Sequence, residues 1–178
     1  MKFLVEARVE IPRQQFWEIR DQDDYLNLYV EVGHLEKIEI VKEWQEKDGV
    51  NHRIQSFTPK LFDGIPDVAR GMMQDIVGTI DEHHTWNDEE EPFVQYFDSK
   101  PRAFEDIVHS YGSMRMEEDG NNACIQTVEG EMRINLPLIS RMCEEAAISN
   151  LDKFYRTTFM EVAGMWIERY SRYSSYSS

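Results

Sequence analysis

The chain has 178 residues, of which 41% are hydrophobic and 12% aromatic, and this length and composition are typical of a single folded domain rather than a disordered segment. Its 34 acidic residues outnumber its 19 basic residues, which gives a formal net charge of −15 at pH 7. A surface of this charge repels phosphate backbones and anionic lipid headgroups, so we expect no nucleic-acid partner and no peripheral membrane binding.

The first part of the chain predicts one strand and two short helices. Apolar and polar residues alternate over residues 2–11, as in a strand with one wet face, and the charges within this stretch argue against a signal peptide. Pro12 ends the strand. Residues 13–21 and 23–32 have the spacing of short helices, and Gly33 closes the second.

The middle of the chain predicts a run of about six strands joined mostly by hairpins. The strand-like stretches are residues 35–47, 50–58, 79–86, 93–98, 107–118 and 122–136. In the first of them, Ile38, Ile40 and Trp44 are expected to share one face. Between the second and the third, residues 66–75 have the pattern of a short helix.

Neither a metal site, a cofactor nor a disulfide is expected. The acidic run at 87–92 lacks the alternating carboxylates and turn glycine of an EF-hand loop, so we interpret it as a solvated hairpin tip. Cys124 and Cys143 lie among apolar neighbours, which favours two buried free thiols in a reducing compartment. We therefore expect a cytoplasmic protein, or one in an organelle if a transit peptide has been removed.

The last third of the chain predicts one long amphipathic helix from Leu138 to about Ser171. Apolar residues recur at helical spacing over more than thirty residues, with most charges between them. Those charges exclude a membrane span. Phe154 and Trp166 are expected to be buried against the sheet. Residues 173–178 are expected to form a disordered tail, so the domain covers residues 1–172.

Strand parity predicts which side chains face this helix. The inward set on the last two strands is Val108, Ser110, Gly112, Met114 and Met116, together with Cys124, Gln126, Val128, Gly130, Met132, Ile134 and Leu136. Small residues in this set leave room, and methionines adapt to irregular shapes. This inward face is compatible with two interpretations: a ligand cavity, or a packed core filled with flexible side chains.

Two adjacent histidines, His83 and His84, lie in the predicted strand at 79–86. Neighbours on a strand point to opposite faces, so the two rings cannot chelate one metal ion. Glu82, His84 and Trp86 share parity. If they face inward, Glu82 and His84 can act as an acid–base pair. The opposite assignment, which the residues alone favour, leaves the histidines as solvated strand residues.

The order of these elements resembles that of the START-like or Bet v 1-like (SRPBCC) superfamily. The most similar stretch is residues 112–145, where Thr127-Val128-Glu129-Gly130-Glu131-Met132 leads to Leu136-Pro137-Leu138-Ile139 and then Glu144. The resemblance covers nearly the whole chain. It implies an α+β helix-grip fold, in which a curved antiparallel sheet of about six to seven strands wraps around the C-terminal helix, with two short helices after the first strand.

The resemblance also implies a function, because members commonly bind lipids, sterols, polyketides or other hydrophobic molecules between sheet and helix. We predict a binding protein for a hydrophobic small molecule or lipid, rather than an enzyme. Its predicted ligand contacts are Trp44, His84, Trp86, Val108, Ser110, Gly112, Met114, Gln126, Val128, Met132, Phe154 and Val162. One alternative is a polyketide cyclase or aromatase that uses Glu82 and His84. Another is an interaction module whose acidic surface meets a basic protein partner.

Overall fold

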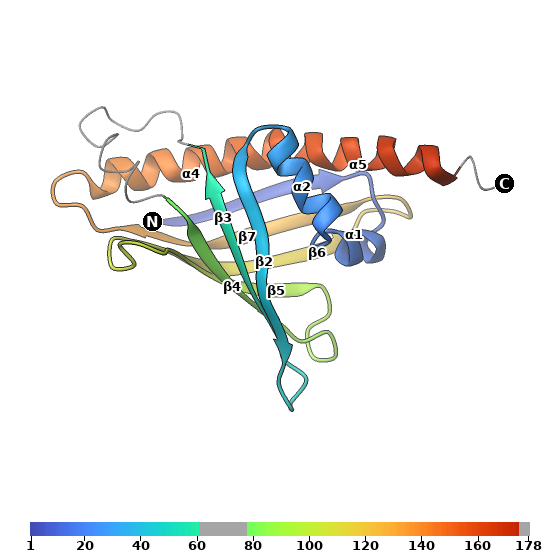
Figure 1. Ribbon diagram of the computed structural model, residues 1–178, viewed down its shortest axis with the longest axis horizontal. Helices are drawn as coiled ribbons and strands as arrows, with labels where there is room; N and C mark the ends of the chain where they lie inside the picture. Colours follow the sequence, from blue (N-terminus) through green and yellow to red (C-terminus); the bar gives the residue numbers. More distant parts are fainter. Residues whose placement is uncertain (61–77, 175–178) are drawn as a thin grey trace.

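The computed structural model of the protein describes residues 1–60 and 78–174, with side chains up to residue 170. The helix expected at 66–75 and residues 175–178 of the expected tail lie outside this range. Within it, seven strands form one antiparallel sheet in the order β1-β7-β6-β5-β4-β3-β2 (Figure 1). The strands are β1 (Lys2–Val9), β2 (Leu35–Gln45), β3 (Asn51–Pro59), β4 (Ile80–Trp86), β5 (Val94–Pro101), β6 (Val108–Glu118) and β7 (Cys124–Ile134).

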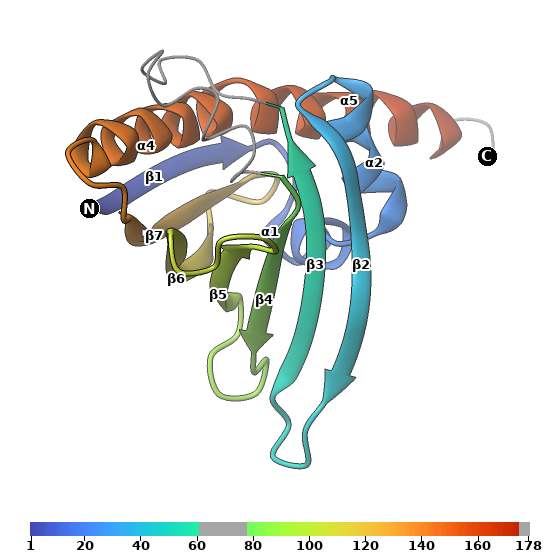
Figure 2. The same cartoon turned by 60° about the vertical axis from the view of Figure 1, so that its left-hand side comes forward.

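The described helices lie in the stretches where the sequence predicts helix. Two short ones follow the first strand, α1 (Arg13–Ile19) and α2 (Asp23–Glu31). The long C-terminal helix runs across the sheet along β1, and the sheet curves away from it toward β3 and β2 (Figure 2). The arrangement is the predicted α+β helix grip.

The long helix consists of two consecutive segments, α4 (Ser140–Arg156) and α5 (Thr158–Ser174). Thr157 separates them, with φ −121° and ψ −77°. Its hydroxyl donates a hydrogen bond to the Lys153 carbonyl oxygen at 2.7 Å, a side-chain contact that often bends helices. The apolar spacing continues across Thr157, so the pattern did not indicate this interruption.

The two segments contact different parts of the protein. The buried residues of α5 pack against α1 and α2, where Val162 is fully buried and Trp166 is 6% exposed. The apolar face of α4 lies over β1 and β7, where Ile148, Leu151 and Tyr155 surround a small cluster of buried side chains. Cys124 and Cys143 are buried free thiols, as predicted.

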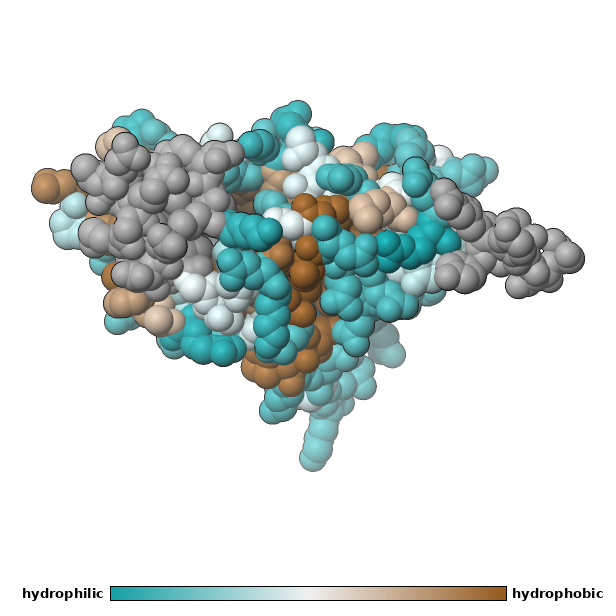
Figure 3. All heavy atoms as spheres, turned by 45° about the horizontal axis from the view of Figure 1, so that its top comes forward, coloured by the Kyte–Doolittle hydropathy of each residue, from teal (hydrophilic) through white to brown (hydrophobic). Residues whose placement is uncertain are grey.

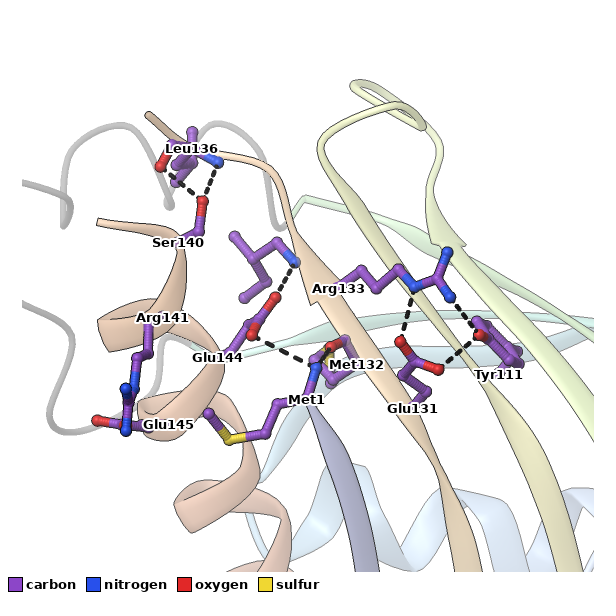
Figure 4. Close-up of polar contacts among 11 residues, drawn as sticks. Met1, Tyr111, Glu131, Met132, Arg133, Leu136, Ser140, Arg141, Glu144 and Glu145 are labelled. Atoms are coloured by element: carbon purple, nitrogen blue, oxygen red, sulfur yellow. Dashed lines mark hydrogen bonds and ion pairs between the residues drawn. The ribbon is translucent and has the colours of Figure 1, made fainter. Parts of the chain in front are cut away.

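Side chains hold the junction between β7 and α4 (Figure 4). The Glu144 carboxylate accepts a hydrogen bond from the Ile134 amide at 3.0 Å and lies 3.4 Å from the amino group of Met1. Ser140 accepts a hydrogen bond from the Leu136 amide at 2.9 Å, which fixes the first turn of α4 to the strand that precedes it. These contacts seat the start of the helix at one end of β7.

On the outer face of the same strand, Glu131 is held by two donors (Figure 4). The Arg133 guanidinium and the Tyr111 hydroxyl each donate a hydrogen bond to its carboxylate at 2.8 Å. These two contacts lower the pKa of Glu131 to about 2. The carboxylate therefore stays ionised well into the acid range.

Gly112 and Gly130 face each other at the centre of the sheet. A Cβ atom on Gly112 would lie 2.7 Å from the Gly130 Cα and 2.9 Å from the Glu129 carbonyl carbon. A Cβ atom on Gly130 would lie 2.9 Å from the Phe3 ring. The sequence suggested that these small residues leave room for a ligand; the neighbouring backbone and the Phe3 ring occupy that position instead.

Candidate functional site

The inner face of the sheet, the side toward α4, is defined by strand register. Directly opposed residues of antiparallel strands have side chains on the same face. The row that contains the buried Val128 is Val5, Val128, Met114 and Gln95. The next two rows are Phe3, Gly130, Gly112, Phe97, His84 and Arg53, followed by Met132, Ser110, Ser99, Glu82 and Gln55. The apolar side chains come mostly from β1, β6 and β7, and the polar ones mostly from β3, β4 and β5.

Register gathers most of the predicted ligand contacts on this face. They are His84, Trp86, Val108, Ser110, Gly112, Met114, Gln126, Val128 and Met132. Val108 lies toward one end of the sheet, where it packs with Ile134 and Leu136 under the start of α4. The remainder come from β4, β6 and β7, and Phe97 of β5, which was not predicted, lies between His84 and Gly112 in the same row.

Trp44 lies on the opposite, outer face of the sheet, which corrects the prediction. A register shift between Ile40 and Lys42 places one extra residue in β2, so parity reverses after it. Trp44 pairs with His52 and stacks on its ring, with centroids 4.8 Å apart and planes 4° apart. His83 stacks on the same indole at 5.6 Å.

Phe154 and Val162, the predicted contacts on the helix, lie away from the centre of the inner face. The half-buried Phe154 ring packs beside α2, with its centroid 5.7 Å from that of Tyr29. Val162 is fully buried among the side chains that α1, α2 and α5 share. Tyr155, which the sequence did not single out, is the α4 aromatic that packs against the cluster around Val128.

Two pairs of polar side chains lie on the inner face, one on β4 and one between β7 and α4. Glu82 and His84 of β4 have side chains only 20% and 13% exposed, so the alternative in which His84 is solvated is wrong. The His84 Nε2 atom lies 2.9 Å from the Glu82 carboxylate. Gln126 of β7 donates to the hydroxyl of Tyr155 of α4 at 3.5 Å. Burial, together with the nearby Glu82 carboxylate, raises the pKa of Tyr155, so its hydroxyl stays protonated.

Arg53 is the cation of the inner rows, and its charge is already matched. Its guanidinium is paired with Asp21 and donates a hydrogen bond to Glu43 at 2.5 Å. It also lies over the Trp86 ring, 5.1 Å from the centroid. The neighbouring Arg20 contacts the same Asp21 at 3.1 Å, and burial lowers the pKa of Arg20 to about 10.

Two inner side chains keep unused hydrogen-bonding capacity. Gln95 is 2% exposed, and its Nε2 atom has no hydrogen-bond partner. Both ring nitrogens of His84 are buried without a hydrogen bond, because the contact with Glu82 lacks hydrogen-bond geometry. The period-2 pattern of Gln95, Phe97 and Ser99 was visible in the sequence, but only the register showed that these residues face inward.

The space-filling view shows where apolar atoms meet the surface. In Figure 3 hydrophobic residues gather in a central stripe bordered on both sides by hydrophilic residues.

Among the described residues, no group of three or more His, Cys, Asp or Glu side chains is placed to hold a metal ion. None of the described helices is both long enough and apolar enough to cross a bilayer.

Comparison with known proteins gives a family and a fold. The family described as "Protein of unknown function (DUF2505)" matches residues 5–167. No curated protein matches the chain. Three solved structures have folds similar to that of this chain. The Zhui aromatase/cyclase of Streptomyces sp. R1128 is 14% identical, with 95% of this chain and 94% of that chain covered and a TM-score of 0.59.

The other two structures come from a bacterium and a plant. Norcoclaurine synthase of Thalictrum flavum, in complex with dopamine and hydroxybenzaldehyde, is 14% identical over 94% of this chain and 87% of that chain, with a TM-score of 0.56. A START superfamily protein of Mycobacterium smegmatis is 10% identical over 90% of this chain and 97% of that chain, with a TM-score of 0.55. At these identities the likeness establishes the START-like, Bet v 1-like fold alone.

Proposed function

The chain belongs to the DUF2505 family, and we propose that it binds a hydrophobic small molecule or lipid between the inner face of the sheet and α4. One observation carries the proposal: apolar side chains between sheet and helix remain only half-buried. They are Phe97, Met114, Met132, Ile148, Leu151 and Tyr155, all packed around Phe3, Val5 and Val128. Side chains in this position are almost completely buried when a core is filled. Partial exposure here is the pattern expected of walls that a ligand completes.

Two serines on β6 provide a matched test. Ser110 lies on the inner face between Ser99 and Met132, whereas Ser113 lies on the outer face between Tyr96 and Glu129. In the Ser110→Leu protein the added side chain enters the proposed binding space. We expect it to abolish binding of Nile red, an uncharged apolar dye, while Ser113→Leu leaves binding unchanged.

Two readouts distinguish a binding space from a filled core. Dye fluorescence reports binding, and native mass spectrometry of freshly purified protein reports any co-purified ligand. Thermal unfolding reports the fit of the new side chain: Ser110→Leu is tolerated if space exists, whereas overpacking of a filled core costs about 1–3 kcal/mol. A destabilised Ser110→Leu protein, combined with a parent protein that binds no dye and carries no ligand, would contradict the proposal.

A catalytic use of the same space is the second candidate, and the inward Glu82–His84 pair favours it. A carboxylate 2.9 Å from an imidazole, in an apolar setting, can remove a proton from a bound substrate. The Tyr155 hydroxyl, protonated because its pKa is raised, can donate a hydrogen bond to an oxygen that gains charge. The similar cyclase fold is compatible with this use.

The catalytic candidate can be tested with a small generic substrate. The ring of 5-nitrobenzisoxazole opens when a base removes its carbon-bound proton, and the product is coloured. We expect Glu82→Gln to remove turnover above background, and Glu129→Gln, which removes an exposed outer-face charge, to preserve it. Equal rates for the parent, Glu82→Gln and Glu129→Gln proteins would end the assignment of Glu82 as a base.

A further inference from the structure

The first strand forms one edge of the sheet and has a row of open backbone groups. Among the described strands, β1 pairs with β7 alone (Figure 2). The backbones of Met1 and Met132 exchange two hydrogen bonds, so odd-numbered residues of β1 direct their amide and carbonyl groups at β7. Even-numbered residues direct theirs at the open edge, and no hydrogen bond from another described residue reaches the backbone of Lys2, Leu4 or Glu6 there.

This edge lacks the irregularities that protect the opposite edge of the sheet. β2, the strand at that opposite edge, contains two register shifts, and irregularities of this kind obstruct pairing with a further strand. β1 pairs with β7 residue for residue from Lys2 to Val9, without a shift. α4 contacts both β1 and β7, so it covers the inner face of these strands. The edge of β1 can therefore accept another strand.

The outer face of β1 exposes an apolar side chain between two opposite charges. Leu4 is 61% exposed, whereas its neighbours Phe3 and Val5 are 8% and 4% exposed on the inner face. Lys2 and Glu6, two residues before and after Leu4, are both exposed. A leucine flanked in this way by a cation and an anion is complementary to an antiparallel copy of itself.

The charges favour one register between two antiparallel copies of β1. With Leu4 on the two-fold axis, each Leu4 lies opposite the Leu4 of the other copy. Lys2 of each copy then lies opposite Glu6 of the other, and all three residues have backbone groups that face the open edge. This register gives two opposite-charge pairs and one apolar contact.

Registers with a longer overlap are less favourable. Moving the axis one residue along β1 places Lys2 opposite Arg8, and moving it two residues places Glu6 opposite a second Glu6. Both arrangements pair like charges, which is destabilising. Moving it three residues brings Glu6 opposite Arg8, but two carboxylates already bind that guanidinium.

We propose that the edge of β1 binds a second copy of the chain, with Leu4 on the two-fold axis, and that the two sheets join into one. Backbone hydrogen bonds between the two β1 strands hold the dimer, as in other cases of strand addition. The apolar contact at Leu4 and the Lys2–Glu6 pairs determine the register. This interface does not depend on the proposed binding function, because it lies at the edge of the sheet and not on its inner face.

Sedimentation velocity of the full chain over a concentration series tests the interface. We expect a species of twice the 21.1 kDa chain mass in 0.15 M salt, where repulsion between the acidic copies is screened. Leu4→Asp places two carboxylates at the axis and should give a monomer. Val41→Asp is the matched control, because Val41 is an exposed apolar residue (54%) of the opposite edge strand, and it should leave the dimer intact.

A charge exchange tests the register. Lys2→Glu and Glu6→Lys should each raise the dissociation constant of the dimer about tenfold, because each creates like-charge pairs. The double variant Lys2→Glu/Glu6→Lys should restore the parent value. In a parallel test, a short bismaleimide reagent should link two copies of the Leu4→Cys protein but not of the Val41→Cys protein, since Cys124 and Cys143 are buried.

The proposal has three ways to fail. A parent protein that remains monomeric at every concentration would overturn it. A dimer that survives Leu4→Asp, or that Val41→Asp dissociates, would place the interface on another surface. A double variant that stays as weak as the single variants would show that Lys2 does not face Glu6. Circular dichroism of each variant establishes that a monomer is folded, so loss of the dimer cannot be mistaken for unfolding.

Discussion

Replacement of Gly112 by alanine adds one methyl group at a point where two central strands touch. The new Cβ atom would lie 2.7 Å from the Gly130 Cα and 2.9 Å from the Glu129 carbonyl carbon. These are backbone atoms of a paired strand, so they cannot move aside as the end of a flexible side chain does. The cost should therefore reach the upper end of the usual range for overpacking, about 3 kcal/mol. In a domain of this size, that cost lowers the melting temperature by about 6–12 °C.

The assay is thermal and urea unfolding followed by circular dichroism, with Ser113→Ala as the control. Ser113 is the next residue on β6 but points to the outer face, so its truncation should change stability by no more than about 0.5 kcal/mol. A Gly112→Ala protein that melts within about 1 °C of the parent would show that the methyl group finds open space. That result would refute the argument that the glycine pair permits close approach of the strands.

Three further predictions concern the core, the thiols and acid stability. Trp166→Ala should cost about 3–5 kcal/mol in urea unfolding because the indole is buried; a cost below about 1 kcal/mol would contradict its place in the core. Burial raises the pKa of Cys124 to about 11 and also raises that of Cys143. Ellman's reagent should therefore detect the two thiols only after denaturation. Rapid reaction of the reagent with the folded protein would contradict this prediction. The pKa of Glu131 is about 2 in the folded protein and 4.5 ordinarily. The ionised carboxylate therefore stabilises the folded protein above pH 4.5, and this contribution is lost as the pH falls toward 2. Glu131→Gln should reduce this acid sensitivity, and an unchanged pH profile would disprove the coupling.

Much of the inner face was predictable because side-chain direction in a strand has a period of two. The sets on β6 and β7, such as Ser110 with Met114 and Gln126 with Val128, face inward as predicted. Parity failed at Trp44, because one extra residue in β2 reverses the alternation, and no residue type marks a bulge of this kind in advance. The alternation of side chains along β4 predicted that His84 and Glu82 share one face. It did not predict whether that face is the inner or the outer one, because both faces of β4 carry polar residues.

The sequence by itself determined the element order and the apolar face of the C-terminal helix, because both follow from local periodicity. The helix-grip architecture was implied by the resemblance of that order to the START-like superfamily. Tertiary structure alone decided which polar groups share the inner face. Glu82, Gln95 and Tyr155 come from β4, β5 and α4, and only strand register and helix placement bring them to one face. It also decided the role of Gly112, because a glycine that leaves space and one that lets two strands touch look identical in a sequence. The physical reason is that local patterns specify the direction of a side chain, whereas its neighbours depend on contacts between residues far apart in the chain.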